Sequence, residues 1–100
     1  MSGQDASLKM RQMAFTYILK LHSGKYYVGS TDDLERRLKE HRNGKVRTTK
    51  VGLPVELVYS EEFSTRGEAQ KKEYRIKNWK NKKLIESLIR KSRQQHGPIV

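Results

Sequence analysis

Two short alternating segments joined by a glycine-containing turn constrain the fold of this chain more than any other feature. Residues 15–21 alternate in a period of two and are rich in strand-forming side chains, and residues 26–28 form a second such segment. Gly24 between them suits the left-handed position of a three-residue hairpin loop. The two segments are therefore expected to form neighbouring antiparallel strands. In that register the opposed pairs are Leu21 with Lys25, Leu19 with Tyr27, and Tyr17 with Gly29.

The rest of the chain predicts three helices and one more strand. Asp32 and Glu35 resemble a capping box at the start of the first helix. Thr65 and Glu68 resemble a second one. The expected fold class is α/β, a small three-stranded antiparallel sheet flanked by helices in the order β-β-α-β-α-α. The predicted segments after the hairpin are a helix from Asp32 to Asn43, a loop at 45–52, a strand at 55–63, a helix from Thr65 to about Trp79, and a helix at 82–91.

Composition excludes several classes of protein. The chain has 100 residues and no cysteine, which excludes a disulfide scaffold, a thiolate zinc site and a cysteine nucleophile. No apolar run approaches the roughly 20 residues of a membrane span, and residues 1–13 lack the apolar stretch of a signal peptide. A cytoplasmic location without a membrane partner is therefore expected. A net charge of +11 indicates a polyanionic partner, nucleic acid in the first instance.

Arg37 and His41 occupy unusual positions on the first predicted helix. Arg37 comes three residues after Leu34 and therefore borders the apolar stripe, and His41 has the same relation to Leu38. A guanidinium at the edge of a core is suited to bind a phosphate through two hydrogen bonds. The structural alternative is that Arg37 extends along the core with its charge in water and that His41 only packs.

Glu73 interrupts the apolar stripe of the second predicted helix. It comes four residues after Ala69 and three before Ile76. A carboxylate is rarely placed there unless it is paired or binds a metal. Lys72 and Lys77 are close enough in sequence to form an ion pair with it, so a structural role stays open beside the functional one.

The predicted strands carry tyrosines whose placement is informative in two cases. Tyr17 and Tyr27 share one face of the hairpin, and Gly29 lies opposite Tyr17. The missing side chain at Gly29 predicts open space in front of the Tyr17 ring. Because tyrosine is also a common strand former, packing in the core or at an edge is the alternative for each of them.

Together these side chains supply two phenols, a guanidinium, an imidazole and a carboxylate, a set suited to phosphodiester hydrolysis. A phenol can orient or deprotonate water, and an arginine can neutralise the charge that develops on the phosphate. One inward carboxylate predicts a single divalent metal and excludes the paired carboxylates of a glycosidase. An oxygen ligand favours Mg²⁺ or Mn²⁺ over Zn²⁺.

These residues, at this spacing, resemble the GIY-YIG nuclease superfamily, and the likeness is greatest to its small single-domain bacterial members. Residues 15–17 (FTY) stand at the GIY position and residues 27–29 (YVG) at the YIG position. Residues 30–41 (STDDLERRLKEH) resemble the family's following helix. Residues 54–59 and 68–79 resemble its third strand and its metal-carrying helix.

The resemblance implies a role for each candidate residue. Tyr17 is expected to activate the attacking water with support from Tyr27, and Arg37 to bind the scissile phosphate. Glu73 is expected to coordinate the single divalent metal, and His41 matches a position that often holds histidine. The implied activity is that of an endonuclease on DNA, with little sequence specificity because no specificity domain accompanies the nuclease fold.

The basic excess is expected to hold the nucleic acid near this site. Such contacts go mainly to phosphates and discriminate little between bases. A non-catalytic nucleic-acid-binding module on the same scaffold is the rival interpretation, and a solvated charged surface is a third. The predicted nucleic-acid contacts are Arg37, Lys45, Arg47, Lys50, Lys72, Lys77, Lys80, Lys82 and Lys83. The predicted organisation is a flexible leader at 1–13, a GIY-YIG-like nuclease domain at 14–91 and a flexible tail at 92–100.

Overall fold

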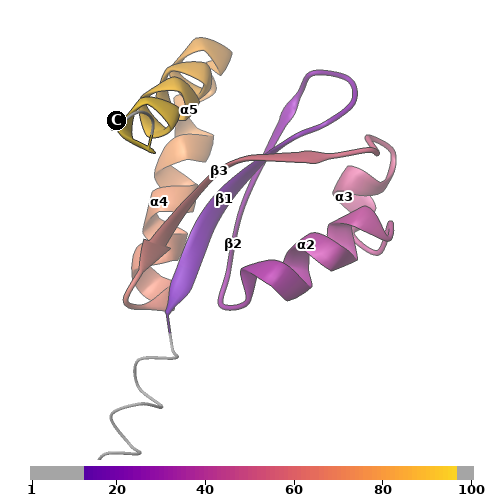
Figure 1. Ribbon diagram of the computed structural model, residues 1–100, viewed down its shortest axis with the longest axis horizontal. Helices are drawn as coiled ribbons and strands as arrows, with labels where there is room; N and C mark the ends of the chain where they lie inside the picture. The colour runs from indigo at the N-terminus through magenta and orange to yellow at the C-terminus, as the bar shows by residue number, and fades with distance from the viewer. Residues whose placement is uncertain (1–12, 97–100) are drawn as a thin grey trace, which may run out of the picture.

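A three-stranded antiparallel sheet lies between two layers of helices in the computed structural model (Figure 1). The structure describes residues 13–96, with side chains up to Arg93. The rest of the predicted leader and the last residues of the predicted tail, 1–12 and 97–100, lie outside the described residues. No described helix combines the length and the apolar character needed to cross a membrane. The elements are β1 (Ala14–Lys20), β2 (Tyr26–Thr31), α2 (Leu34–Arg42), α3 (Arg47–Lys50), β3 (Glu56–Phe63), α4 (Arg66–Trp79) and α5 (Lys82–His96).

The sheet confirms the predicted hairpin and its register. Strand order is β2-β1-β3, and both neighbours of β1 run antiparallel to it. Tyr17 is opposite Gly29 and Leu19 is opposite Tyr27, as the alternation predicts. Gly24 closes the loop with a φ of +93°, a conformation that glycine adopts without strain. The central strand β1 therefore has both edges paired, whereas β2 forms one open edge of the sheet.

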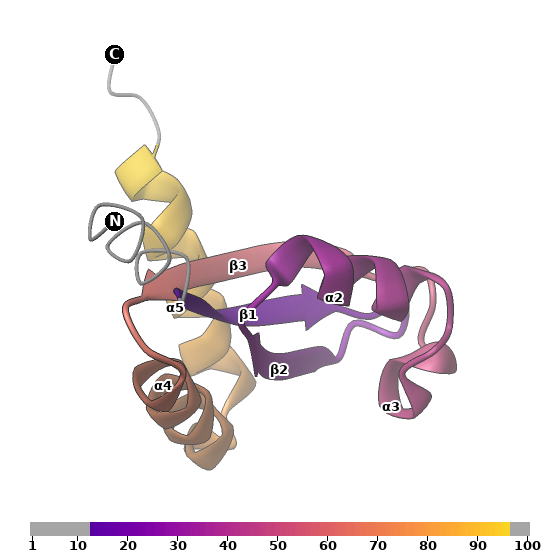
Figure 2. The same cartoon turned by 90° about the horizontal axis from the view of Figure 1, so that it is seen from below.

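The two faces of the sheet are covered by different helices. Tyr17 and Leu19 of β1 point toward α2 and pack with Leu38. Ile18, between them in sequence, points the other way and packs with Ile76 of α4 and with α5. Figure 2 shows α2 on one side of the sheet and α4 on the other. Each strand therefore supplies side chains to two separate halves of the core.

The helix starts are confirmed at one site and shifted by one residue at the other. Thr65 caps α4 by accepting a hydrogen bond from the Glu68 amide at 3.1 Å. At α2 the cap is Asp33, which accepts from the Arg36 amide at 3.0 Å, and not the predicted Asp32. The Asp32 carboxylate instead lies 3.6 Å from the Arg36 guanidinium. Adjacent aspartates offer the same capping group, so composition alone does not select between them.

Two predicted boundaries are wrong. The predicted loop at 45–52 contains the one-turn helix α3, which is closed by hydrogen bonds from the Thr49 and Lys50 amides to the Val46 carbonyl. A single turn is too short to show a helical period. The last helix continues five residues beyond the predicted Lys91, to His96. No glycine or proline interrupts it before residue 97, so the polar residues after the apolar stripe remain helical.

Candidate active site

Four of the predicted site residues lie together between the β1–β2 hairpin and α2. The Tyr17 and Tyr27 ring centroids are 6.2 Å apart. The His41 ring lies edge-on to both of them, with centroids 5.7 Å from Tyr17 and 5.0 Å from Tyr27. Arg37 comes one helical turn before His41 and its guanidinium lies beside both phenols. The shared face of the tyrosines and the i,i+4 spacing on the helix therefore produce a real cluster.

Gly29 is required by this cluster, although not for the predicted reason. A Cβ at residue 29 would lie 2.7 Å from the Tyr17 hydroxyl oxygen and 2.8 Å from its Cζ. The expected open space in front of Tyr17 is absent, because the Tyr17 ring itself fills it. Close approach of the ring to the strand is what requires glycine here.

A chain of hydrogen bonds links the Tyr17 hydroxyl to His41 of α2 and Thr49 of α3. The Thr49 hydroxyl donates to the Val46 carbonyl at 3.4 Å, so its oxygen is free to accept from His41 Nδ1–H at 2.8 Å. His41 Nε2 is then unprotonated and accepts from the Tyr17 hydroxyl at 2.9 Å. Tyr17, His41 and Thr49 are all almost completely buried. This buried relay, from Tyr17 through His41 to Thr49, therefore fixes the tautomer of the histidine.

The pKa values in the relay support this arrangement. Burial, with a further contribution from the nearby Arg37 charge, lowers the pKa of His41 to about 4. Burial raises the pKa of Tyr17 to about 12, although the Arg37 guanidinium acts against that increase. Both groups are therefore neutral near pH 7. The Tyr17 hydroxyl donates a hydrogen bond to His41, and its oxygen faces the Arg37 guanidinium.

Arg37 lies at the solvent side of the cluster. Its Nη1 donates to Glu40 Oε1 at 2.9 Å, and about a third of each side chain is exposed. Glu40 first, and then Tyr17, raise the pKa of the guanidinium above its already high value, so Arg37 is a permanent cation. Glu40 was not among the predicted site residues, although its place one turn after Arg37 indicates such a pair. Thr49 was missed because no local pattern marks it.

Glu73 lies on the other face of the sheet, at the open edge formed by β2. Its Oε1 accepts a hydrogen bond from Ser30 Oγ at 2.6 Å, and its Oε2 lies 2.7 Å from Lys77 Nζ. Lys72, the other predicted partner, pairs with Glu61 instead. Ser30 directly follows Gly29 in β2. The Gly29 backbone packs against the Tyr17 ring on the α2 face, whereas the Ser30 side chain points to the α4 face. The structure therefore brings Glu73 to the strand residue next to Gly29, on the opposite face of the sheet from the tyrosine cluster, and does not bring it into the cluster itself.

The donor set at Glu73 fits a weakly held divalent cation with water ligands. The carboxylate is one-fifth exposed, and Ser30 holds its orientation. Among the described residues, no group of three or more His, Cys, Asp or Glu side chains could form a complete cage. Mg²⁺ commonly keeps several waters and binds through one or two carboxylates plus substrate phosphate oxygens. One carboxylate at a solvent-accessible edge is compatible with that mode of binding.

Most predicted nucleic-acid contacts are exposed and lie in two groups on either side of the hairpin loop. One group surrounds α3, and the loop is tied to that region because the His22 amide donates to the Gly52 carbonyl at 2.8 Å. The other group lies where α4 meets α5, close to Gly24 at the tip of the loop. The exposed members are Lys45, Arg47 and Lys50 in the first group and Lys77, Lys80, Lys82 and Lys83 in the second.

Comparison with known proteins gives concordant matches. Residues 13–86 match the GIY-YIG catalytic domain. A UPF0213 protein of Bacillus pumilus is 46% identical over 70 residues, which cover 69% of this chain and 71% of the relative. The UPF0213 protein YazA of Bacillus subtilis is 44% identical over a stretch of the same length and coverage. The solution NMR structure of the UPF0213 protein BH0048 from Bacillus halodurans shares 32% identity at a TM-score of 0.53, covering 86% of this chain and 88% of that one.

Proposed function

Because this chain belongs to the GIY-YIG family, a nuclease superfamily, we propose that it is a metal-dependent endonuclease acting on DNA with little sequence specificity. The observation that carries the proposal is the cluster of Tyr17, Tyr27 and Arg37 held by a buried relay beside an edge strand. A purely structural cluster has no need for a permanent, partly exposed cation beside two phenols. A phosphate oxygen is the ligand that such a cation would take.

The roles of the two tyrosines follow from their burial and hydrogen bonds. We expected Tyr17 to activate the attacking water, but it is 1% exposed and its proton is directed to His41. Tyr27 is partly exposed on the same face. In the proposed mechanism Tyr27 orients the attacking water through a hydrogen bond, while Tyr17 positions Arg37. His41 then acts through Tyr17 and does not contact the substrate.

Arg37 supplies the principal positive charge toward the scissile phosphate. Its two phenol neighbours hold the guanidinium at the rim of the cluster, where a phosphate can approach it. Phosphate binding requires Arg37 to exchange its contact with Glu40 for the ligand. That exchange is feasible because the ion pair is partly exposed and therefore weak.

Glu73 would hold the divalent cation, with Ser30 fixing one carboxylate oxygen. When bound, Mg²⁺ or Mn²⁺ supplies positive charge that stabilises the pentavalent phosphate. Lys77 now neutralises the carboxylate at 2.7 Å and must move aside or share it. Lys77 can then turn toward a phosphate, since its side chain is more than half exposed.

The test is nicking of supercoiled plasmid and of branched DNA with Mg²⁺ or Mn²⁺. The wild-type protein is expected to cut, and Arg37→Ala and Glu73→Ala are expected to lose cleavage while remaining folded. Lys39→Ala is the matched control, because Lys39 is exposed on the same helix as Arg37 and outside the cluster. Cleavage by Glu73→Ala at the wild-type rate would reject the proposed metal ligand.

A non-catalytic nucleic-acid-binding module is the second candidate, and one observation favours it. Both charged groups at the site already have partners, Arg37 with Glu40 and Glu73 with Lys77. In a binding module these pairs would remain closed. DNA binding by the wild-type protein without cleavage in any divalent metal would establish this alternative.

A further inference from the structure

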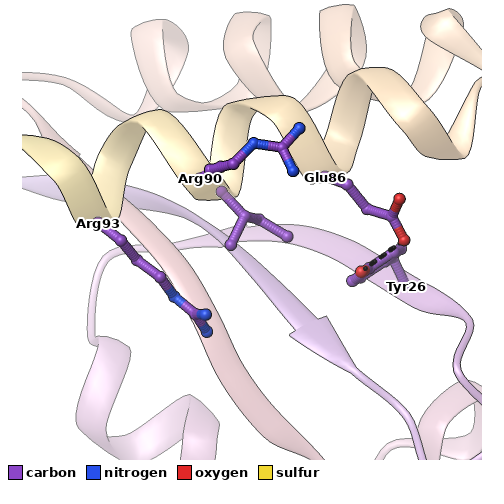
Figure 3. A pocket seen from close by; sticks show the side chains of 5 residues that line it. Tyr26, Glu86, Arg90 and Arg93 are labelled. Carbon is purple, nitrogen blue, oxygen red and sulfur yellow. Dashed lines mark hydrogen bonds between the residues drawn. The ribbon is translucent and has the colours of Figure 1, made fainter.

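A pocket on the second face of the sheet has no part in the tyrosine cluster (Figure 3). It has a volume of about 290 Å³ and lies between the start of β2 and the outer part of α5. Tyr26 lines it from the strand, and Glu86, Ile89, Arg90 and Arg93 line it from the helix. Ile89 is 7% exposed and belongs to the core, so the pocket has an apolar floor and a charged rim.

Positive charge exceeds negative charge around this pocket. The one carboxylate, Glu86, accepts a hydrogen bond from the Tyr26 hydroxyl at 3.3 Å (Figure 3). Lys82 Nζ lies 5.9 Å from the centre of the Tyr26 ring, and the Arg93 charge is near enough to oppose the rise in the pKa of that phenol. Neither Arg90 nor Arg93 forms an ion pair with any residue whose side chain the structure describes. The pocket is therefore suited to an anion.

The two arginines are placed to bind phosphate. They are three residues apart on α5, and side chains at that spacing lie on the same side of a helix. Arg93 extends from the helix toward the strands, and Arg90 lies along the helix toward Glu86 (Figure 3). Guanidinium groups bind phosphate oxygens through paired hydrogen bonds, which lysines cannot form. The apolar floor lowers the effective dielectric constant beside them and strengthens that attraction.

The location of the pocket relates it to Glu73. Tyr26 and Ser30 are four residues apart on β2 and point to the same face, since side chains alternate along a strand. Their Cα atoms are therefore separated by roughly 13 Å. Ser30 holds Glu73, so the pocket and the carboxylate lie at two points along one open sheet edge.

We propose that the α5 pocket binds a backbone phosphate of the same nucleic-acid strand whose scissile phosphate lies at Glu73. The scissile phosphate at Glu73 rests on the proposed function, whereas phosphate binding at Arg90 and Arg93 does not. The pocket then sets a minimum substrate length. A substrate that reaches only Glu73 lacks the second contact.

The test measures binding of DNA hairpins with stems of 4 to 12 base pairs in the presence of Ca²⁺, which can occupy a carboxylate site, and a gel verifies that the hairpins remain uncut. Wild-type affinity is expected to rise about tenfold at the stem lengths that first reach both the α5 pocket and Glu73. In the Arg90→Ala/Arg93→Ala variant this step disappears, and the slope of log affinity against log salt for long stems falls by about 1.8. Both side chains are exposed, so the variant is expected to keep the wild-type melting temperature.

The matched control is Lys71→Ala/Arg75→Ala, which removes two exposed charges from α4 and keeps the step. Equal affinity of Arg90→Ala/Arg93→Ala and wild type at every stem length would overturn the proposal. It would also be overturned if inorganic phosphate, but no hairpin, shifted the NMR signals of the two arginines, because the pocket would then bind small anions only. A wild type that shows the step but never cleaves DNA would reject the nuclease and retain the pocket.

Discussion

The two faces of the sheet satisfy their polar groups in opposite ways. Under α2, the Tyr17 hydroxyl, the His41 ring and the Thr49 hydroxyl form a closed, buried chain. Under α4 and α5, Glu73 is paired with a half-exposed lysine, and the arginines of the α5 pocket stand at the surface. A buried chain fixes geometry, because each member left unpaired costs stability. Exposed charges exchange partners readily and so suit the capture of ligands.

The largest expected effect concerns Arg37, the cation beside the two tyrosines of the α2 face. Arg37→Ala should reduce the rate of DNA cleavage by about 10²–10³-fold, since a preorganised charge acts on the transition state. Single-turnover cleavage, together with a thermal melt to verify folding, measures the effect. If Lys77→Ala, at an exchangeable ion pair of the α4 face, lost as much activity as Arg37→Ala, the proposed division between a fixed face and an exchangeable face would be wrong.

The buried relay should make the protein sensitive to acid. The pKa of His41 is about 4 in the folded protein and about 6.5 in an unfolded chain, so the unfolded state takes up the proton first. The contribution of neutral His41 to the free energy of unfolding is therefore fully present above pH 6.5. It is lost as the pH decreases toward 4, by roughly 3 kcal/mol in total. Urea unfolding at several pH values measures this loss. His22→Ala, at an exposed histidine, should leave the profile unchanged.

Thr49, at the end of the relay furthest from Arg37, should contribute to the free energy of unfolding almost as much as His41. Thr49→Val removes the acceptor for His41 Nδ1–H and should lower the free energy of unfolding by about 1–3 kcal/mol. Thr49→Ser keeps the hydroxyl and should retain most of that stability. The ¹⁵N shifts of His41 report its tautomer directly. An unchanged Nδ1–H tautomer in Thr49→Val would show that Thr49 does not fix the ring.

The smallest effect is expected at a charged pair on the second face. Lys72 lies 3.4 Å from Glu61, and the Glu61 side chain is 41% exposed. Lys72→Met should change the free energy of unfolding by less than about 1 kcal/mol. Urea unfolding measures this change, and a loss as large as that of Thr49→Val would contradict the contrast between the two faces.

Local features of the sequence predicted the parts of this molecule that depend on local spacing. Alternation and Gly24 predicted the hairpin register, and hence the shared face of Tyr17 and Tyr27. The helical period placed Arg37 and His41 near that face. Thr49 is different, because its contact with His41 closes between a helix and a four-residue turn that shows no period.

The contacts that determine how the site works are those between segments far apart in the chain. Glu73 was recognised as a misplaced carboxylate, but its hydrogen bond to Ser30 joins α4 to β2 over 43 positions of sequence. Composition around Arg90 and Arg93 indicates only positive charge, and the pocket appears when α5 packs beside Tyr26. Which phenol is buried also depends on packing, and the burial of Tyr17 is why the proposed mechanism assigns the water to Tyr27.

A nuclease site in this molecule requires the two faces of the sheet to meet at the β2 edge. Paramagnetic broadening of NMR signals by Mn²⁺ tests this most directly. The amides of Gly29 and Ser30 and the ring of Tyr27 should broaden at low Mn²⁺ concentration, and Glu73→Ala should abolish the effect. Broadening that spares Tyr27, or that persists in Glu73→Ala, would contradict a common site at this edge.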